Sequence, residues 1–136
     1  MKFPNPFKKK TAVQISDSSQ DPNTMPEPHD VEGYRRRGWA FHSRGLNDQA
    51  EADFRRAISI DPEDVDATYV LGLVLKAQGR KDEAIVSFQK AVDLIQAGKV
   101  ENRDRREMLR RLALGHINEI KDGDWNLEKE IWQRVE

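Results

Sequence analysis

The stretch YRRRGWAFHSRGLNDQAEADFRRAISIDP, residues 34–62, decides the fold, because much of its pattern returns 34 residues later. The residues that are identical at this step are small, aromatic or turn-forming: Gly38 and Gly72, Gly45 and Gly79, Asp48 and Asp82, Ala50 and Ala84, Phe54 and Phe88, Ala57 and Ala91. Six identities at one fixed spacing indicate an internal repeat.

Each copy predicts two helices joined by a short turn. Phe54, Ala57 and Ile58 follow helical spacing and form one apolar face. Gly45 comes where the first helix should end, and glycine accepts the left-handed conformation of such ends. Pro62 lacks a backbone N–H, so it ends the second helix and opens the next turn.

Gly38 stands inside the first predicted helix, where glycine costs about 1 kcal/mol relative to alanine. We therefore expect a neighbour that packs too close for a Cβ atom. Ala50, a small residue on the second helix of the hairpin, is the predicted partner.

These residues resemble the tetratricopeptide repeat, a 34-residue family pattern of aromatic, apolar, glycine and alanine positions. The first copy supplies seven of these positions: Tyr34, Gly38, Phe41, Ala50, Phe54, Ala57 and Pro62. The second copy supplies six: Leu71, Gly72, Leu75, Ala84, Phe88 and Ala91. The departures are Arg37 for a large apolar residue, Thr68 for the first aromatic residue, and Gln96 for proline. The resemblance implies an all-α helix-turn-helix solenoid that binds other proteins.

The domain is expected to span residues 30–136, with repeats at about 31–64 and 65–98 and an irregular third helix pair at about 101–136. A shift of nine residues beyond the period aligns Leu114 and Gly115 with the second copy and sets Ile131 against Phe88. We expect the insertion to lengthen the fifth helix. The sixth helix, after Asp122-Gly123-Asp124, should cap the solenoid, because a terminal helix needs one apolar and one polar face.

Residues 1–29 carry five of the six prolines and few large apolar side chains, so we expect a disordered tail. Phe3 and Phe7 beside Lys8–Lys10 could touch a membrane, but a weak basic-aromatic cluster binds only marginally.

Composition narrows the class of protein further. The chain has 136 residues, 35% of them charged, a net charge of −1 and no cysteine; its mean hydropathy is −0.84. Disulfides and thiolate metal sites are excluded, and no apolar run approaches the roughly 18 residues of a membrane span. No hydrophobic segment follows the N-terminal lysines, so a cytoplasmic location is expected.

Two alternatives to a binding module were weighed. His42, His116 and Glu119 could form a metal site of an enzyme, although no metalloprotease-type spacing is present. Arginines at 35–37 and 103–111 could contact nucleic acid. Interleaved acids such as Glu32, Asp104 and Glu107 favour local ion pairs instead. We predict a protein that is not an enzyme and that has no cofactor, metal or nucleic-acid partner.

By the resemblance, the first helices of the repeats line a concave groove for a peptide or a partner helix. The groove positions are Arg35, Trp39 and His42 from the first copy and Tyr69, Leu73 and Lys76 from the second. Trp39, Tyr69 and Leu73 are expected to form an exposed apolar strip flanked by two cations, which would favour a ligand with some negative charge. Whether a partner, the chain's own tail or a second copy in a homodimer fills the groove is left open.

Overall fold

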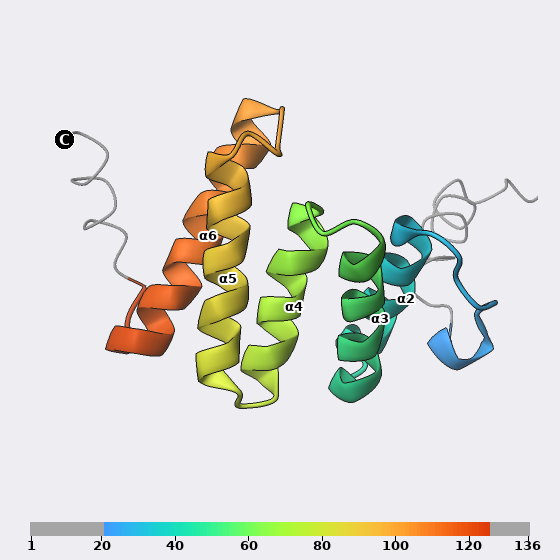
Figure 1. Ribbon diagram of the computed structural model, residues 1–136. Helices are drawn as coiled ribbons and strands as arrows, with labels where there is room; N and C mark the ends of the chain where they lie inside the picture. The colour runs from blue at the N-terminus through green and yellow to red at the C-terminus, as the bar shows by residue number, and fades with distance from the viewer. Residues whose placement is uncertain (1–20, 126–136) are drawn as a thin grey trace, which may run out of the picture.

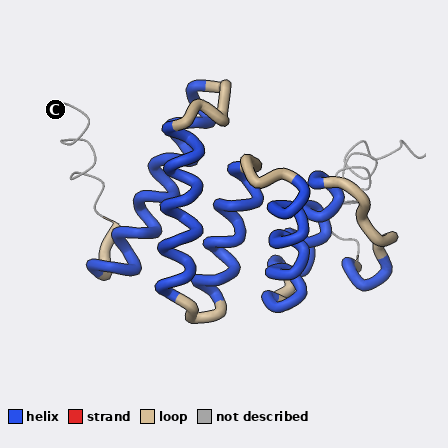
Figure 2. The backbone as a smooth tube through the Cα atoms, in the orientation of Figure 1, coloured by secondary structure: helices blue, strands red, loops and turns tan. Residues whose placement is uncertain are grey.

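The computed structural model describes residues 21–125, which form one short 3-10 turn and five α-helices (Figure 1). The 3-10 turn is η1 (Pro22–Thr24), and the helices are α2 (Val31–Ser43), α3 (Asn47–Ile60), α4 (Val65–Ala77), α5 (Lys81–Gln96) and α6 (Arg103–Asp122). Within residues 21–125 there is no strand, as the tube in Figure 2 makes plain. The predicted all-α helix-turn-helix solenoid is confirmed for this part of the chain.

Each helix packs on the next one along the chain, so α2 with α3 and α4 with α5 are hairpins. Ion pairs join α2, α4 and α6 along one face, including Arg35–Asp66 and Lys76–Glu119. We call this face the inner face. The helices α3 and α5 stand in front of α2 and α6 in the view of Figure 1 and form the outer layer.

The turn signals recur with the period of the sequence. The side chains of Asp30 and Asp64 cap α2 and α4, accepting from backbone N–H groups at 2.7 and 3.1 Å. Gly45 and Gly79 follow these helices with φ angles of 74° and 77°, the left-handed conformation that the sequence predicted. Pro62 lies in the turn between α3 and α4, also as predicted.

Glycine makes room for a phenylalanine ring inside each hairpin. A Cβ atom on Gly38 would stand 2.9 Å from the Phe54 ring, and one on Gly72 would stand 2.7 Å from Phe88. Both rings are buried, with exposed fractions of 1% and 0%. The prediction that Ala50 is the partner of Gly38 is therefore wrong. Ala50 is buried, as Ala84 is, but the ring of Phe54 reaches across the hairpin and takes the space of the missing methyl group.

We expect Gly72→Ala to destabilise the protein by about 1 kcal/mol. Alanine gains about 1 kcal/mol of helix propensity, but overpacking against Phe88 costs about 1–3 kcal/mol. In a Phe88→Leu background the clash is relieved, so the same change should become neutral or stabilising. Urea unfolding of the four proteins measures this coupling. An equal gain from Gly72→Ala in both backgrounds would contradict the packing argument.

Residues 21–29 differ from the expected disordered tail. Pro22 is fully buried, and η1 packs on α2. The Glu27 carboxylate pairs with Arg37 at 2.9 Å and accepts a hydrogen bond from the Tyr34 hydroxyl at 3.4 Å. A buried proline and a cross-segment ion pair hold these residues on the first repeat, although their composition suggested a solvated segment. Residues 1–20 lie outside the described part.

Arg37 departs from the family pattern because it pairs with Asp53 inside the first hairpin. Its guanidinium donates to both carboxylate oxygens of Asp53, at 2.9 and 2.7 Å, and the Asp53 side chain is only 4% exposed. The hydrogen bond with Asp53 raises the pKa of Arg37. One repeat later the same positions hold Leu71 and Ser87. In the first repeat, a bidentate ion pair thus takes the place of an apolar contact.

Asp53→Ala should destabilise the protein by about 3 kcal/mol, because it leaves a largely buried guanidinium without its main partner. The double change Arg37→Leu/Asp53→Ser installs the residues of the second repeat and should recover most of this loss, since apolar replacements of buried ion pairs are often neutral. Denaturation midpoints of the three proteins provide the measurement. A double variant as unstable as Asp53→Ala would show that the first repeat requires the ion pair.

The third unit begins with a helix longer than the first helices of the two repeats. The helix α6 has 20 residues against 13 in α4, so part of the insertion lengthens this helix. The ring that lies over Gly115 is that of Trp125, which follows the turn at Gly123. Ile131 and the rest of the predicted sixth helix lie outside the described residues, and its capping role stays a prediction.

Candidate functional site

The inner face carries the six predicted groove residues in two matching sets. Arg35, Trp39 and His42 lie on α2, and the 34-residue step takes them to Tyr69, Leu73 and Lys76 on α4. The structure places these residues on the predicted helices, but each residue has different surroundings.

Trp39 is the exposed aromatic residue of this face, with half of its surface, 51%, open to solvent. Its ring centroid lies 5.6 Å from that of His42, whose Nδ1 atom is 2.8 Å from the Asn47 side chain. Leu73, one repeat along, is partly buried against the core. We call Trp39, His42 and Leu73 the inner apolar patch.

Tyr69 does not extend this patch, because it is buried and only 7% exposed. Its ring meets those of Phe88 on α5 and His116 on α6 edge to face, at centroid distances of 5.7 and 6.0 Å. Burial raises the pKa of its hydroxyl. The expected strip of Trp39, Tyr69 and Leu73 is therefore interrupted, since the third helix pair contributes a ring that contacts Tyr69.

The two cations that should flank the groove are ion-paired within the chain. Arg35 lies 3.3 Å from Asp64 and 3.2 Å from Asp66, and Asp66 also pairs with Arg105 of α6. The Lys76 ammonium lies 2.6 Å from Glu119. These pairs tie α2 to α4 and α4 to α6, so the expected preference for a negatively charged ligand loses its basis.

His116 lies half-buried among aromatic rings, at a position that the sequence offered as a metal ligand. Its ring stacks on Phe88 at 4.9 Å and 10°, and Trp125 meets it edge to face at 4.7 Å. The Lys76 ammonium lies 3.1 Å from Nδ1. Burial and Lys76 lower the pKa of His116, with a partial opposing effect from Glu119. Neutral imidazole is therefore favoured, with Nδ1 accepting from Lys76.

The hypothetical metal site of His42, His116 and Glu119 is not formed. The Lys76 ammonium contacts both His116 and Glu119, so the cation that these two side chains meet is a lysine. Across residues 21–125 no cluster of three or more His, Asp or Glu side chains is arranged to hold a metal ion.

Four of the arginines proposed for nucleic acid, Arg35, Arg36, Arg37 and Arg105, have carboxylate partners. Arg36 pairs with Glu32 at 3.0 Å, and Arg37 and Arg105 pair as described above. Such pairing matches the predicted solvated, self-neutralised face. That nucleic acid is not a partner stays a prediction.

The helices of the described chain include none that is long and apolar enough to cross a membrane. The cytoplasmic location stays a prediction.

Stacked helix hairpins with a repeating glycine-aromatic contact and a helix-lined inner face define a helical-repeat scaffold. More narrowly, residues 35–99 match the model of the tetratricopeptide repeat family. The resemblance found in the sequence is thus confirmed. As a class, tetratricopeptide repeats are scaffolds for protein-protein interaction and are generally not enzymes.

One relative with a curated name is cellulose synthase 2 operon protein C of Komagataeibacter xylinus, 38% identical over 86 residues. The match covers 63% of this chain but only 6% of that relative's length. The shared region is therefore a small part of a much larger protein.

His116 predicts a pH dependence of stability. Its pKa is lowered by folding from an ordinary 6.5, so the unfolded chain takes up a proton more readily. Stability is fully present above about pH 6.5 and falls as the pH drops towards the lower pKa of the folded state. The lowered pKa values of Glu27, Glu51, Glu83 and Glu119 start from 4.5, so these groups act in a more acidic range.

The test is to compare urea midpoints at pH 7.5 and 5.5 for the wild type and for His116→Gln, which keeps an acceptor for Lys76 but cannot titrate. We expect the variant to lose less stability between these two pH values. Equal losses in the two proteins would contradict the role given to His116.

Proposed function

We propose that the chain is a non-catalytic adaptor whose inner face binds a peptide or helix of another protein, with Trp39 as the anchor. The observation that supports this proposal is the exposure of Trp39, 51%, on the face formed by the first helices of the repeats. An exposed tryptophan next to further apolar surface is typical of the residues that dominate protein interfaces.

The neighbours of Trp39 define what such a ligand would contact. Leu73 offers apolar surface one repeat away, and His42 lies beside the indole ring. His42 beside the indole and Leu73 on the next first helix can each pack against a ligand side chain.

The charges around the patch argue for apolar rather than ionic selection. Arg35 and Lys76 already face carboxylates at 3.3 Å or less. A ligand carboxylate would have to compete with these internal partners, and exposed ion pairs contribute only about 0–1 kcal/mol. The proposed ligand is therefore an apolar face, such as one side of an amphipathic helix, and the proposal involves no cofactor.

Trp39→Ala tests this proposal, with Ile60→Ala as its matched control. Ile60 is equally exposed, 51%, but lies at the end of α3 in the outer layer. Immobilised wild type and variants are exposed to extract of the source cells, a captured protein is identified, and its affinity is then measured by calorimetry. We expect Trp39→Ala to weaken binding at least about tenfold, as truncated hot-spot residues do, and Ile60→Ala to leave it unchanged.

Circular dichroism melting of both variants provides the folding control. A Trp39→Ala protein that melts normally and binds as the wild type does would overturn the proposal. So would a large fall in melting temperature, because Trp39 would then contribute mainly to stability.

A further inference from the structure

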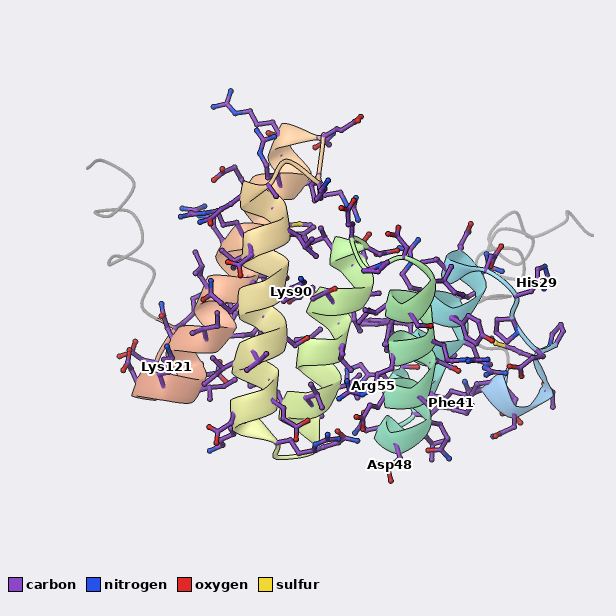
Figure 3. All side chains as sticks on the ribbon, viewed as in Figure 1. His29, Phe41, Asp48, Arg55, Lys90 and Lys121 are labelled. Carbon is purple, nitrogen blue, oxygen red and sulfur yellow. The ribbon has the colours of Figure 1, made fainter. Side chains whose placement is uncertain are left out.

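A second apolar surface lies on the opposite layer, between α3 and α5. It is a groove of about 620 Å³. Thr68, Leu71 and Leu75 of α4 form its floor, and Ile58 and Ser59 of α3 form one wall. Glu83, Val86, Ser87 and Lys90 of α5 form the other wall. We call it the outer groove; Figure 3 labels Arg55 and Lys90, which lie at its rim on α3 and α5.

The repeat explains why the outer groove is open. In the first repeat the corresponding positions hold large side chains: Tyr34 for Thr68, Arg37 for Leu71 and Asp53 for Ser87. There Arg37 pairs with Asp53 and with Glu27, and Arg56 lies over the Tyr34 ring. The second repeat has smaller residues at the same places, and no segment among residues 21–125 fills the space.

Val86 makes this surface conspicuous. It is 69% exposed, more than Trp39, Ile60 or Met108, and it stands at the rim of the groove. An exposed branched side chain beside an apolar hollow is typical of a contact site.

The hydroxyl groups of the groove favour a helix over an extended strand as the occupant. Ser59, Thr68 and Ser87 all donate to backbone carbonyl oxygens of the chain, at 2.7, 3.0 and 2.7 Å. Their protons are already used, so they could accept from the N–H groups of an extended ligand but could not donate to its carbonyl groups. A helix carries its own backbone hydrogen bonds and can present side chains alone.

The charges on α5 indicate which helix would fit. Glu83 and Lys90 are seven residues apart on the same side of α5, about 10.5 Å along its axis, with Val86 and Ser87 between them. Lys90 makes no ion pair within residues 21–125, while Glu83 is 53% exposed although it pairs with Arg80 and Arg55. A second α5 laid antiparallel over the first brings each Glu83 opposite the Lys90 of the other copy.

We propose that the outer groove is the interface of a twofold dimer, in which two α5 helices pack antiparallel with Val86 of each copy against the groove of the other. This interface is isologous: one patch meets itself, and its two charges complement each other across the axis. The inner apolar patch is not part of it, so the dimer and the proposed adaptor function stand or fall separately.

Sedimentation equilibrium of the full chain, from micromolar to about millimolar concentration, tests the dimer. The wild type is expected to show a concentration-dependent monomer-dimer equilibrium. Val86→Asp should abolish it, because a carboxylate would be buried against Leu71 and Leu75 of the other copy. Trp39→Ala, on the inner face, should leave it unchanged.

Charge exchange gives the decisive comparison. Glu83→Lys and Lys90→Glu should each weaken association about tenfold, because each creates two repulsive contacts in a symmetric dimer. The double variant Glu83→Lys/Lys90→Glu restores opposite charges across the axis and should return within a few-fold of the wild type. Thermal melting of each variant separates loss of association from loss of folding.

Several results would overturn the proposal. One is a wild type that stays monomeric over the whole range. Another is a double variant no better than the weaker single one, since the charge pair would then not cross the interface. A dimer that survives Val86→Asp but is lost in Trp39→Ala would place the association on the inner face.

Discussion

The contact between a helical glycine and an aromatic ring sets the geometry on which the rest of the structure depends. Because Gly72 has no Cβ, the Phe88 ring of α5 occupies the space that a methyl group on α4 would take, and Gly38 with Phe54 repeats the contact. A larger residue at either glycine would have to push the ring or the helix away. Trp125 supplies the ring over Gly115, so the irregular third unit has the same glycine-aromatic contact with a different aromatic residue.

The 34-residue repeat of the sequence predicts those structural features that depend on local residue chemistry. The hairpins, the left-handed glycines and the capping aspartates follow from residue type and spacing, and the structure confirms them. The predictions that failed depend on contacts with distant parts of the chain. The burial of Tyr69 requires the position of His116 on α6, which the sequence could not place after a nine-residue shift. The role of Asp53 had a signal that went unused: it faces Arg37, the departure from the family pattern.

The high content of charged residues serves the structure itself more than outside partners. Arg35, Asp66 and Arg105 link the three inner helices, and Lys76 with Glu119 repeats the link further along. These pairs connect the helices of the inner face and offset opposite charges on it. Under the proposed function, recognition by this surface would rest on shape and apolar contact and would depend weakly on salt. The outer groove differs, because Lys90 has no internal partner within the described residues.

The segment that contains Pro22 and Glu27 packs on α2 of the first repeat, whereas α3 packs on α4 of the second. It has a consequence for how such an array can grow. Another hairpin could not stack on α2 while this segment is in place, and Arg37 with Asp53 makes that end chemically unlike the others. The second repeat carries no comparable ion pair: the matching residues, Leu71 and Ser87, line the open outer groove. Stacking a further hairpin on α2 would therefore require this segment to leave its place on the first repeat.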